Sequence, residues 1–435
     1  MNMNSYMTII KRHGAVIFFI FAACIYGLSA GLKINRQSRT PQYVFLANSF
    51  LHGHLDLTST PESKFDLIEY EGRWFVPGGM GPALILMPVV SIFGTGVSDV
   101  FFGVILGSIN VSLIFLLLSA LDVDFVVNIW LTVLFAFGTV HWWVSSVGSV
   151  WFNAQLVALS CMILHVLATL KDRPLLAGSF LGGAMLSRPT TLFSIPFFLL
   201  MTYKRENSFT RSVARLIPFA AMVAGAVSLM LAYNYLRFGA PLEFGYGYVQ
   251  GTKALTDAFA RGGGFSLRYF LCNFYVSILG LPNIAWNPLP GVNAACPHLE
   301  PVIHDFTGLS SFFNPLGMSI FITSPAFFLI FKGKSKDPLV PSAWAGMLGT
   351  LLVLWMYHST GWVQFGYRYT LDFIVFIFIL LSKAVTQIRN LERILIGLSV
   401  VMGATGVYLM YYMTFGLVWP EMFLEMMKKF YWMIF

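Results

Sequence analysis

Apolar residues along the chain form long uninterrupted runs separated by short polar segments, without the alternation that marks barrel strands. A run of roughly 17–25 apolar residues can cross a bilayer as a helix, and inside lipid the backbone is satisfied only in helices or closed barrels. The pattern therefore predicts an all-α polytopic membrane protein with about 11 transmembrane helices. The expected spans cover residues 15–32, 100–121, 126–140, 150–170, 175–203 (two helices), 213–236, 315–331, 343–357, 369–381 and 394–413.

Several polar or short segments interrupt this pattern. Arg188 and Pro189 lie inside the apolar run 175–203, and because a charge in lipid is costly and proline disfavours helix before it, two helices should meet there. The apolar stretch 80–93 is too short to span comfortably, which indicates a helix that lies in the outer interface or dips into the membrane and returns. Residues 141–146 are expected to form a short outward loop, and the aromatic run 269–281 a segment on the membrane surface.

Composition and charge set the orientation. The chain is 57% hydrophobic and 11% charged, with a mean hydropathy of +0.73, which excludes a soluble protein. The net charge of +8 comes from basic residues in short loops, the positive-inside signature rather than a nucleic-acid surface. The segments 33–79 and 237–314 should therefore lie outside the cytoplasm, opposite the loops at Lys204 and Lys334.

The two long outer segments also divide the chain. Residues 1–236 are expected to form a catalytic transmembrane module that includes the first outer loop 33–79. Residues 237–314 form an extracytoplasmic loop, and residues 315–435 a C-terminal transmembrane module. The first apolar run lacks a small-residue cleavage site and is expected to stay as an anchor.

The four cysteines lack metal-ligand spacing, and no metal site is expected from them. Cys272 and Cys296 share the second outer segment, where an oxidising compartment would permit a disulfide. The sequence leaves open whether they pair.

The first outer segment is a candidate for chemistry because it concentrates carboxylates in an otherwise apolar chain. Five of the 19 acidic residues lie between positions 56 and 71, among them Asp56 and Asp66. The alternative is a solvated loop whose acids balance nearby basic residues such as Arg39. On this segment alone the two interpretations stay open.

Three arginines are expected at outer membrane boundaries: Arg188, Arg237 and Arg368. A guanidinium is always charged and binds phosphate through paired hydrogen bonds, which suits the phosphate of a lipid-linked donor. The alternative is snorkelling of each arginine toward headgroups. At i,i+4 spacing, Asp372 is expected to pair with Arg368 and orient it.

Two further residues are second-rank candidates for substrate binding. Glu243 lies just past Arg237, and Trp142 offers an aromatic face that can stack on a sugar ring or anchor the chain at the interface.

The layout resembles the GT-C superfamily of membrane glycosyltransferases, particularly bacterial relatives of protein mannosyltransferases and aminoarabinose transferases. Four segments carry the resemblance: YEGRWFVP at 70–77 leading into Gly81-Pro82, GSFLGGAMLSRP at 178–189, YNYLRFGAP at 233–241, and GWVQFGYRY at 361–369. The segment GMSIFITSP at 317–325 is similar to one in an uncharacterised bacterial subgroup.

The resemblance implies a sugar donor linked to polyprenyl phosphate, a site facing away from the cytoplasm, and an acidic residue in the first outer loop as catalytic base. The chain departs from the family pattern because residues 35–48 contain no acid. Asp66 and Asp56 are the nearest substitutes, and Asp66 is preferred because it lies closer to the segment that returns to the membrane.

The expected function is therefore an inverting hexosyl or pentosyl transfer from a polyprenyl-phosphate sugar to a glycan, lipid or protein acceptor, outside a bacterial inner membrane. No cofactor is expected, a divalent metal is left open, and no nucleic acid is expected as a partner. Two alternatives remain: a transporter or flippase of a lipid-linked glycan, which should carry charges at mid-bilayer, and an inactive scaffold for envelope assembly.

Overall fold

The computed structural model describes residues 3–206, 208–251, 253–282, 296, 314, 316–333, 337–361 and 363–415. Among these residues, five helices are long and apolar enough to cross a membrane, or six spans when one bent pair is counted as a single span. The chain is thus an integral membrane protein. The five are α1 (Met3–Ala30), α4 (Asp99–Ala120), α7 (Val150–Leu170), α10 (Phe209–Phe238) and α18 (Asn390–Phe415).

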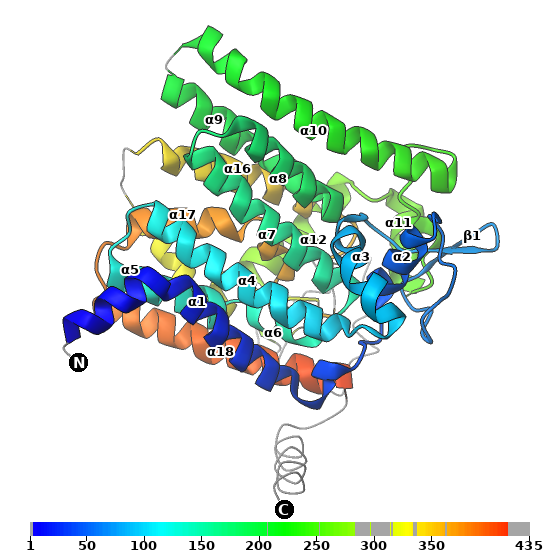
Figure 1. Cartoon of the computed structure of the whole chain (residues 1–435), viewed down its shortest axis with the longest axis horizontal. Helices are drawn as coiled ribbons and strands as arrows, with labels where there is room; N and C mark the ends of the chain where they lie inside the picture. The colour runs from blue at the N-terminus through cyan, green and yellow to red at the C-terminus, as the bar shows by residue number, and fades with distance from the viewer. Residues whose placement is uncertain are drawn as a thin grey trace, which may run out of the picture.

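The remaining helices are shorter, and the expected total of about eleven spans counted all of those named here except α3, which corresponds to the stretch 80–93. They include α3 (Gly81–Phe93), α8 (Pro174–Ser187), α9 (Ile195–Glu206), α16 (Leu339–Trp355) and α17 (Ile374–Ala384). The helices run in the same general direction (Figure 1). In the first half of the chain α1 packs on α4, α4 on α7, α7 on α8, and α8 on α10.

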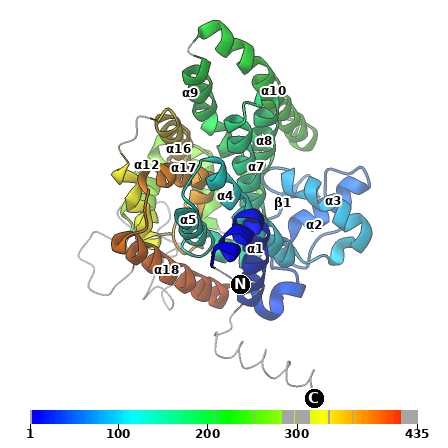
Figure 2. The ribbon, with the colours of Figure 1, turned by 60° about the vertical axis from the view of Figure 1, so that its left-hand side comes forward.

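The first long loop folds into a small cap at one end of this bundle. It contains η1 (Gly31–Asn35), α2 (Gln42–Leu51) and a hairpin of β1 (Ile68–Tyr70) and β2 (Arg73–Phe75), in antiparallel register with Ile68 opposite Phe75. The helix α2 packs on α3. Figure 2 shows α2, α3 and β1 gathered on one side of the bundle, with α12, α16 and α18 on the other.

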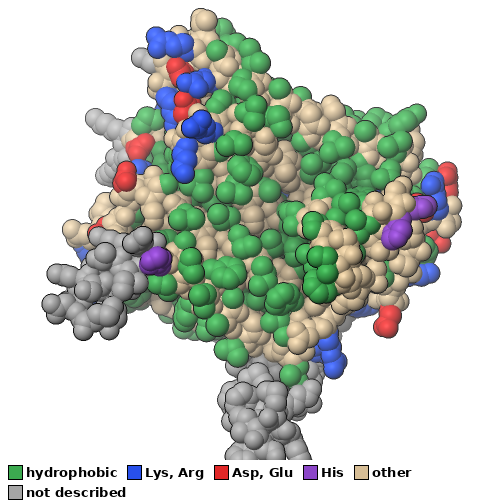
Figure 3. Space-filling view, viewed as in Figure 1, with side chains coloured by type: hydrophobic (Ala, Val, Ile, Leu, Met, Phe, Trp, Pro, Cys, Tyr) green, Lys and Arg blue, Asp and Glu red, His purple; other side chains and the backbone are tan. Residues whose placement is uncertain are grey.

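The second long segment meets this cap. It contains η4 (Tyr246–Tyr248) and α11 (Lys253–Gly262), and a bridge between Ile68 and Val249 joins it to β1. In Figure 1 the labels of α2, β1 and α11 lie at the right, while the junction of α9 and α10 lies at the opposite end. That end carries a cluster of charged residues in which Arg205 and Arg215 both form ion pairs with Asp172. On the face in Figure 3, charged side chains gather toward the two ends, and hydrophobic and neutral ones fill the middle.

The break expected at Arg188 is confirmed. The helix α8 ends at Ser187, Arg188 is extended (φ −139°, ψ 96°), and Pro189 opens η3 (Pro189–Ser194) before α9. This is the backbone that proline imposes on the residue before it.

The prediction of a loop at 141–146 is wrong, because these residues form α6 (His141–Val147). This helix follows α5 (Phe125–Phe137) after a bend of 49°. Its polar side chains find partners inside the protein instead of at the interface: the ring of His141 bonds the Tyr26 hydroxyl, and the Trp143 indole donates to the carbonyl of Phe365.

The span expected at 315–331 is also not one helix. It is divided into α15 (Ile320–Thr323) and η8 (Pro325–Lys332), with Ser324 extended before Pro325. The span expected from residue 369 begins instead with η9 (Arg368–Asp372), and α17 starts only at Ile374. The polar residues of η9 are thereby kept out of a regular helix.

The aromatic run of the second segment forms η5 (Leu267–Tyr269), α12 (Phe270–Phe274) and η6 (Tyr275–Leu279). It packs against the end of α16: the Asn273 amide donates to the carbonyl of Tyr357 at 2.7 Å. The disulfide left open by the sequence is present between Cys272 and Cys296, whose Cα atoms lie 4.8 Å apart. Most of 283–313 and the C-terminal tail after 415 lie outside the described residues.

Candidate functional site

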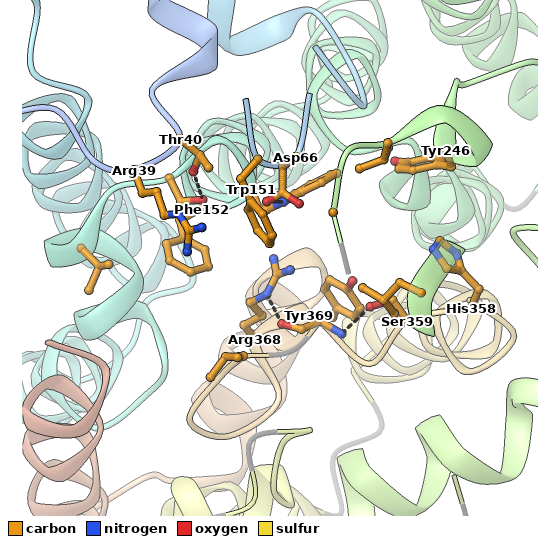
Figure 4. Close-up of a pocket in the computed structure, with 18 of the residues that line it drawn as sticks. Arg39, Thr40, Asp66, Trp151, Phe152, Tyr246, His358, Ser359, Arg368 and Tyr369 are labelled. Atoms are coloured by element: carbon orange, nitrogen blue, oxygen red, sulfur yellow. Dashed lines mark hydrogen bonds between the residues drawn. The ribbon is translucent and has the colours of Figure 1, made fainter. Parts of the chain in front are cut away.

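A cavity of about 560 Å³ opens where the two long segments meet the helical bundle. Its walls come from the loop before α2, the segment before β1, the start of α7, the second long segment and the stretch between α16 and α17. Figure 4 shows that Asp66 and Trp151 lie on one wall and that Arg368 points toward them from the opposite wall. The lining thus brings together segments from both halves of the sequence.

Asp66 is held in the cavity by its backbone and by one side-chain contact. Its φ of 64° lies in the left-handed region, and its N–H donates to the carbonyl of Gln250 at 2.7 Å. The indole Nε1 of Trp151 donates to Asp66 Oδ2 at 2.8 Å. Among the described residues nothing donates to Oδ1, so one carboxylate oxygen is fixed and the other is available.

Burial changes the acidity of this carboxyl group. Loss of water around Asp66 raises its pKa to about 6, although the hydrogen bond from Trp151 and the charges of Arg368 and Arg39 act in the opposite direction. The side chain is half-buried. A carboxyl group with a pKa near 6 is ionised at neutral pH and is basic enough to accept a proton from a substrate.

Two hydrogen bonds hold the guanidinium of Arg368 in place. Its Nε donates to the carbonyl of Gly361 at 2.7 Å and its Nη1 donates to Oε1 of Gln155 at 2.9 Å. Gly361 has a φ of +95°, and a Cβ there would lie 3.1 Å from Arg368 Nε, so glycine is needed for this approach. The second terminal nitrogen, Nη2, makes no hydrogen bond with the described residues and is available to a ligand.

Arg39 is the second cation of the cavity. Its guanidinium lies 4.6 Å from the ring centre of Phe65 and forms no ion pair with a described residue. The preceding residue is anchored, because Ser38 donates through its N–H to the buried carboxylate of Asp99 at 2.7 Å. The sequence had suggested only that Arg39 balances nearby acids, and its position beside Arg368 and Asp66 became visible only in three dimensions.

Aromatic side chains line much of the remaining surface. Trp151 and Tyr246 lie with their ring planes 18° apart and their centres 6.4 Å apart, and Phe152, Tyr357 and Tyr369 complete this wall. Flat apolar faces beside hydrogen-bonding edges suit a ligand with both apolar and hydroxyl-bearing faces. Neither Trp151 nor Tyr246 is among the substrate-binding candidates named from the sequence.

Arg188 does not line this cavity. Its Nη2 donates to Asp372 Oδ2 at 2.9 Å, in an ion pair that Thr190 also joins by donating its hydroxyl at 2.7 Å. The expected pair of Asp372 with Arg368 is therefore wrong. Both residues lie in the 3-10 helix η9, where the i,i+4 geometry of an α-helix does not apply, and the carboxylate turns to Arg188 instead.

The other four candidates also lie outside the cavity lining. Arg237 is buried, donates to the carbonyl of Val76 and to the side chain of Asn234, and packs on a tyrosine ring. Glu243 accepts a hydrogen bond from the N–H of Gly245 in a turn, and the indole of Trp142 donates to the hydroxyl of Ser29. Asp56 contacts His54 at 3.7 Å. Of the seven residues singled out from the sequence, the cavity thus brings together Asp66 and Arg368.

The described residues contain no group of three histidine, cysteine or acidic side chains that could hold a metal ion. In the cavity, Asp66 and His358 are the side chains of these types.

No family model matches the chain, and no curated protein matches it. Among solved structures it is similar to ArnT from Cupriavidus metallidurans bound to undecaprenyl phosphate, with a TM-score of 0.46 and 11% identity over 88% of this chain and 62% of that one. It is also similar to the archaeal oligosaccharyltransferase AglB from Archaeoglobus fulgidus in complex with an inhibitory peptide and a dolichol-phosphate. There the TM-score is 0.42, with 12% identity over 93% of this chain and 56% of that one. The chain spans less than two thirds of the length of either protein.

Proposed function

We propose that the chain is a membrane glycosyltransferase of the GT-C type that takes a hexosyl or pentosyl group from a polyprenyl-phosphate donor. The observation that carries this proposal is the carboxylate of Asp66, ionised near neutral pH and fixed by Trp151, facing the guanidinium of Arg368 across an aromatic cavity. A base and a cation on opposite walls suit a reaction in which a proton leaves one substrate and negative charge develops on the other.

The donor phosphate binds between Arg368 and Arg39 in this proposal. Arg368 is already oriented by Gly361 and Gln155, so little reorganisation is needed when charge develops on the phosphate oxygen. Arg39 is exposed, lines the same cavity and supplies a second positive charge. The lipid tail stays in the bilayer, which removes the need for a nucleotide-binding loop.

In the reaction, an acceptor oxygen attacks the anomeric carbon from the face opposite the phosphate. The new C–O bond forms as the bond between that carbon and the phosphate oxygen breaks, and the electron pair leaves with the polyprenyl phosphate. The acceptor proton passes to Asp66, and the attack from the face opposite the phosphate inverts the configuration of the anomeric carbon. The acceptor is a glycan, lipid or protein. The site lies on the side of a bacterial inner membrane that faces away from the cytoplasm.

The experiment supplies purified protein in lipid with a panel of radiolabelled polyprenyl-phosphate hexoses and pentoses and follows donor consumption. Asp66→Asn should reduce turnover by at least about a hundredfold, the loss typical of a missing general base, while donor binding is kept. Asp56→Asn is the matched control, because Asp56 lies in the same loop but outside the cavity. Wild-type protein that consumes none of the donors, or an active Asp66→Asn variant, would refute the proposal.

A further inference from the structure

The two oxygens of the Asp66 carboxylate have different surroundings. Oδ2 accepts the hydrogen bond from Trp151, on the side where α7 begins. Oδ1 faces the second long segment, where Gly251 is its neighbour: a Cβ built on Gly251 would lie 3.5 Å from Oδ1. Gly251 is exposed and also lines the cavity. The available oxygen is therefore on the solvent side of the carboxylate.

The position of Gly251 beside Asp66 is fixed by backbone pairing. Asp66 N–H donates to the carbonyl of Gln250, and Gln250 N–H donates to the carbonyl of Leu67, each at 2.7 Å. The neighbouring bridge between Ile68 and Val249 continues this pairing. Because these hydrogen bonds fix Gln250, the position of Gly251 beside Oδ1 follows from the fold.

The glycine at this position is not required by its backbone. Its φ lies outside the left-handed region, and an added Cβ would make only ordinary contacts, at 3.4 Å to Val249 and 3.5 Å to Asp66. Alanine would thus be tolerated by the fold. A side chain at this position would instead lie in van der Waals contact with Oδ1, within the lining of the cavity.

We infer that Gly251 forms the entrance through which the acceptor reaches Asp66 Oδ1 from the aqueous side, and that the acceptor is a neutral carbohydrate hydroxyl. This inference rests on the proposed function. The donor then occupies the Arg368 side of the cavity, and the acceptor enters between Gly251 and the aromatic wall.

The chemistry of the base selects a neutral alcohol. An alcohol must lose its proton as it attacks, and a carboxylate within hydrogen-bond reach accepts it. A phosphate acceptor is already ionised at neutral pH, needs no base, and would be repelled by the charge of Asp66. The available Oδ1, with no donor from the described residues, is suited to receive a hydroxyl hydrogen bond.

The aromatic wall beside Gly251 favours a sugar among the neutral alcohols. Trp151 and Tyr246 offer near-parallel ring faces at this entrance. Such faces pack against the C–H face of a sugar ring while its hydroxyl groups stay hydrated or hydrogen-bonded.

The test compares three acceptors of increasing size with an active donor: water, methanol and octyl β-glucoside. In Gly251→Ala, transfer to octyl glucoside should fall at least about tenfold, whereas donor hydrolysis by water should stay within about twofold of wild type. Gly247→Ala is the matched control, because it lies in the same segment, makes equally ordinary contacts and does not line the cavity.

A cysteine variant tests the same position by modifying protein that has already folded. Gly251→Cys, with Cys24 and Cys161 replaced by serine, is assayed before and after alkylation of the folded protein. Alkylation should abolish transfer to octyl glucoside and spare hydrolysis, and alkylated Gly247→Cys should keep both. Equal acceptor preferences in the Gly251 and Gly247 variants would refute the assignment of Gly251 as the acceptor entrance but would leave the proposed function unaffected. Transfer to a phosphate acceptor that survives Asp66→Asn would overturn the acceptor class, and a wild type without donor consumption would overturn the function and the inference together.

Discussion

The guanidinium of Arg188 donates to the carboxylate of Asp372, 184 residues further along the chain, with Nη2 and Oδ2 2.9 Å apart. Both side chains are buried, and the hydroxyl of Thr190 completes the shell of the carboxylate. The guanidinium also lies 4.9 Å from the ring centre of Tyr369, whose ring is equally close to Arg368. The pair therefore supports one wall of the cavity from behind, and its two charges compensate each other.

Breaking this pair should destabilise the protein. Arg188→Ala leaves the Asp372 charge buried without a partner, and Asp372→Ala does the same to Arg188, so each should cost about 3–5 kcal/mol. The measurement is the loss of folded protein after heating in detergent, followed by size-exclusion chromatography. The double variant Arg188→Met/Asp372→Leu should lose less than either single variant, because neither charge remains. A normally stable Arg188→Ala with weakened donor affinity would instead assign Arg188 to the donor.

The helices with long apolar runs could be predicted from sequence because lipid dictates their length and composition. α4 and α7 begin and end within about two residues of the expected bounds. The break at Arg188 followed from the local chemistry of proline. In contrast, α6 was missed because His141 and Trp143 obtain buried partners from α1 and from residue 365, which no local pattern reveals.

The candidate site could be predicted only in part for the same reason. Asp66 was identified by the rarity of carboxylates and Arg368 by its position at a membrane boundary. Arg188 carried the same local signal as Arg368, and the difference between them is the distant carboxylate of Asp372. Gly251 and Arg39 line the cavity beside residues that are far away in sequence, so composition and spacing give no indication of their positions.

Removing the side chain of Arg39 should weaken donor binding without affecting the fold, because the residue is exposed and makes no hydrogen bond with the described residues. For an exposed charge pair worth about 1 kcal/mol, Arg39→Ala should raise the donor KM roughly fivefold. The loss should shrink at high salt, where exposed charges are screened. Arg36→Ala, an exposed arginine outside the cavity, is the control and should match wild type. An unchanged KM in Arg39→Ala would remove Arg39 from the donor site.

The disulfide should protect two of the four cysteines from thiol reagents. Denatured protein should therefore show two free thiols, from Cys24 and Cys161, without reductant and four with reductant. Replacing Cys272 and Cys296 with serine should lower stability by about 2–4 kcal/mol, because a closed loop restricts the unfolded chain. Alkylation followed by mass spectrometry gives the thiol count. Equal counts with and without reductant would show that the pair stays reduced.

The two long segments should react with impermeant reagents from the outside. In a background with Cys24 and Cys161 replaced by serine, Glu62→Cys is expected to label in intact cells, because loop 33–79 lies on the side of the disulfide and disulfides persist in oxidising compartments. Lys204→Cys lies at the opposite, basic end and should label only after the membrane is permeabilised. Both positions are exposed, so accessibility within the protein is matched. The reverse labelling pattern would place the site in the cytoplasm.

The hydrogen bond from Trp151 should set the pH at which the enzyme becomes active. It stabilises the ionised form of Asp66 and so lowers a pKa that burial has raised to about 6. A general base works when ionised, so kcat/KM should rise with pH, and at pH 6 it should reach about half of its value at pH 8. Trp151→Phe removes the donor but keeps an aromatic face, so the pKa should increase and the acidic limb should move to higher pH. The ratio of kcat/KM at pH 6 to that at pH 8 should therefore fall below one half.

Two control variants should leave the acidic limb in place: Trp74→Phe, which lies outside the cavity, and His358→Gln, which removes the imidazole in the cavity. If the limb follows His358 instead, or if Trp151→Phe lowers activity equally at both pH values, Asp66 is not the group whose ionisation limits the reaction.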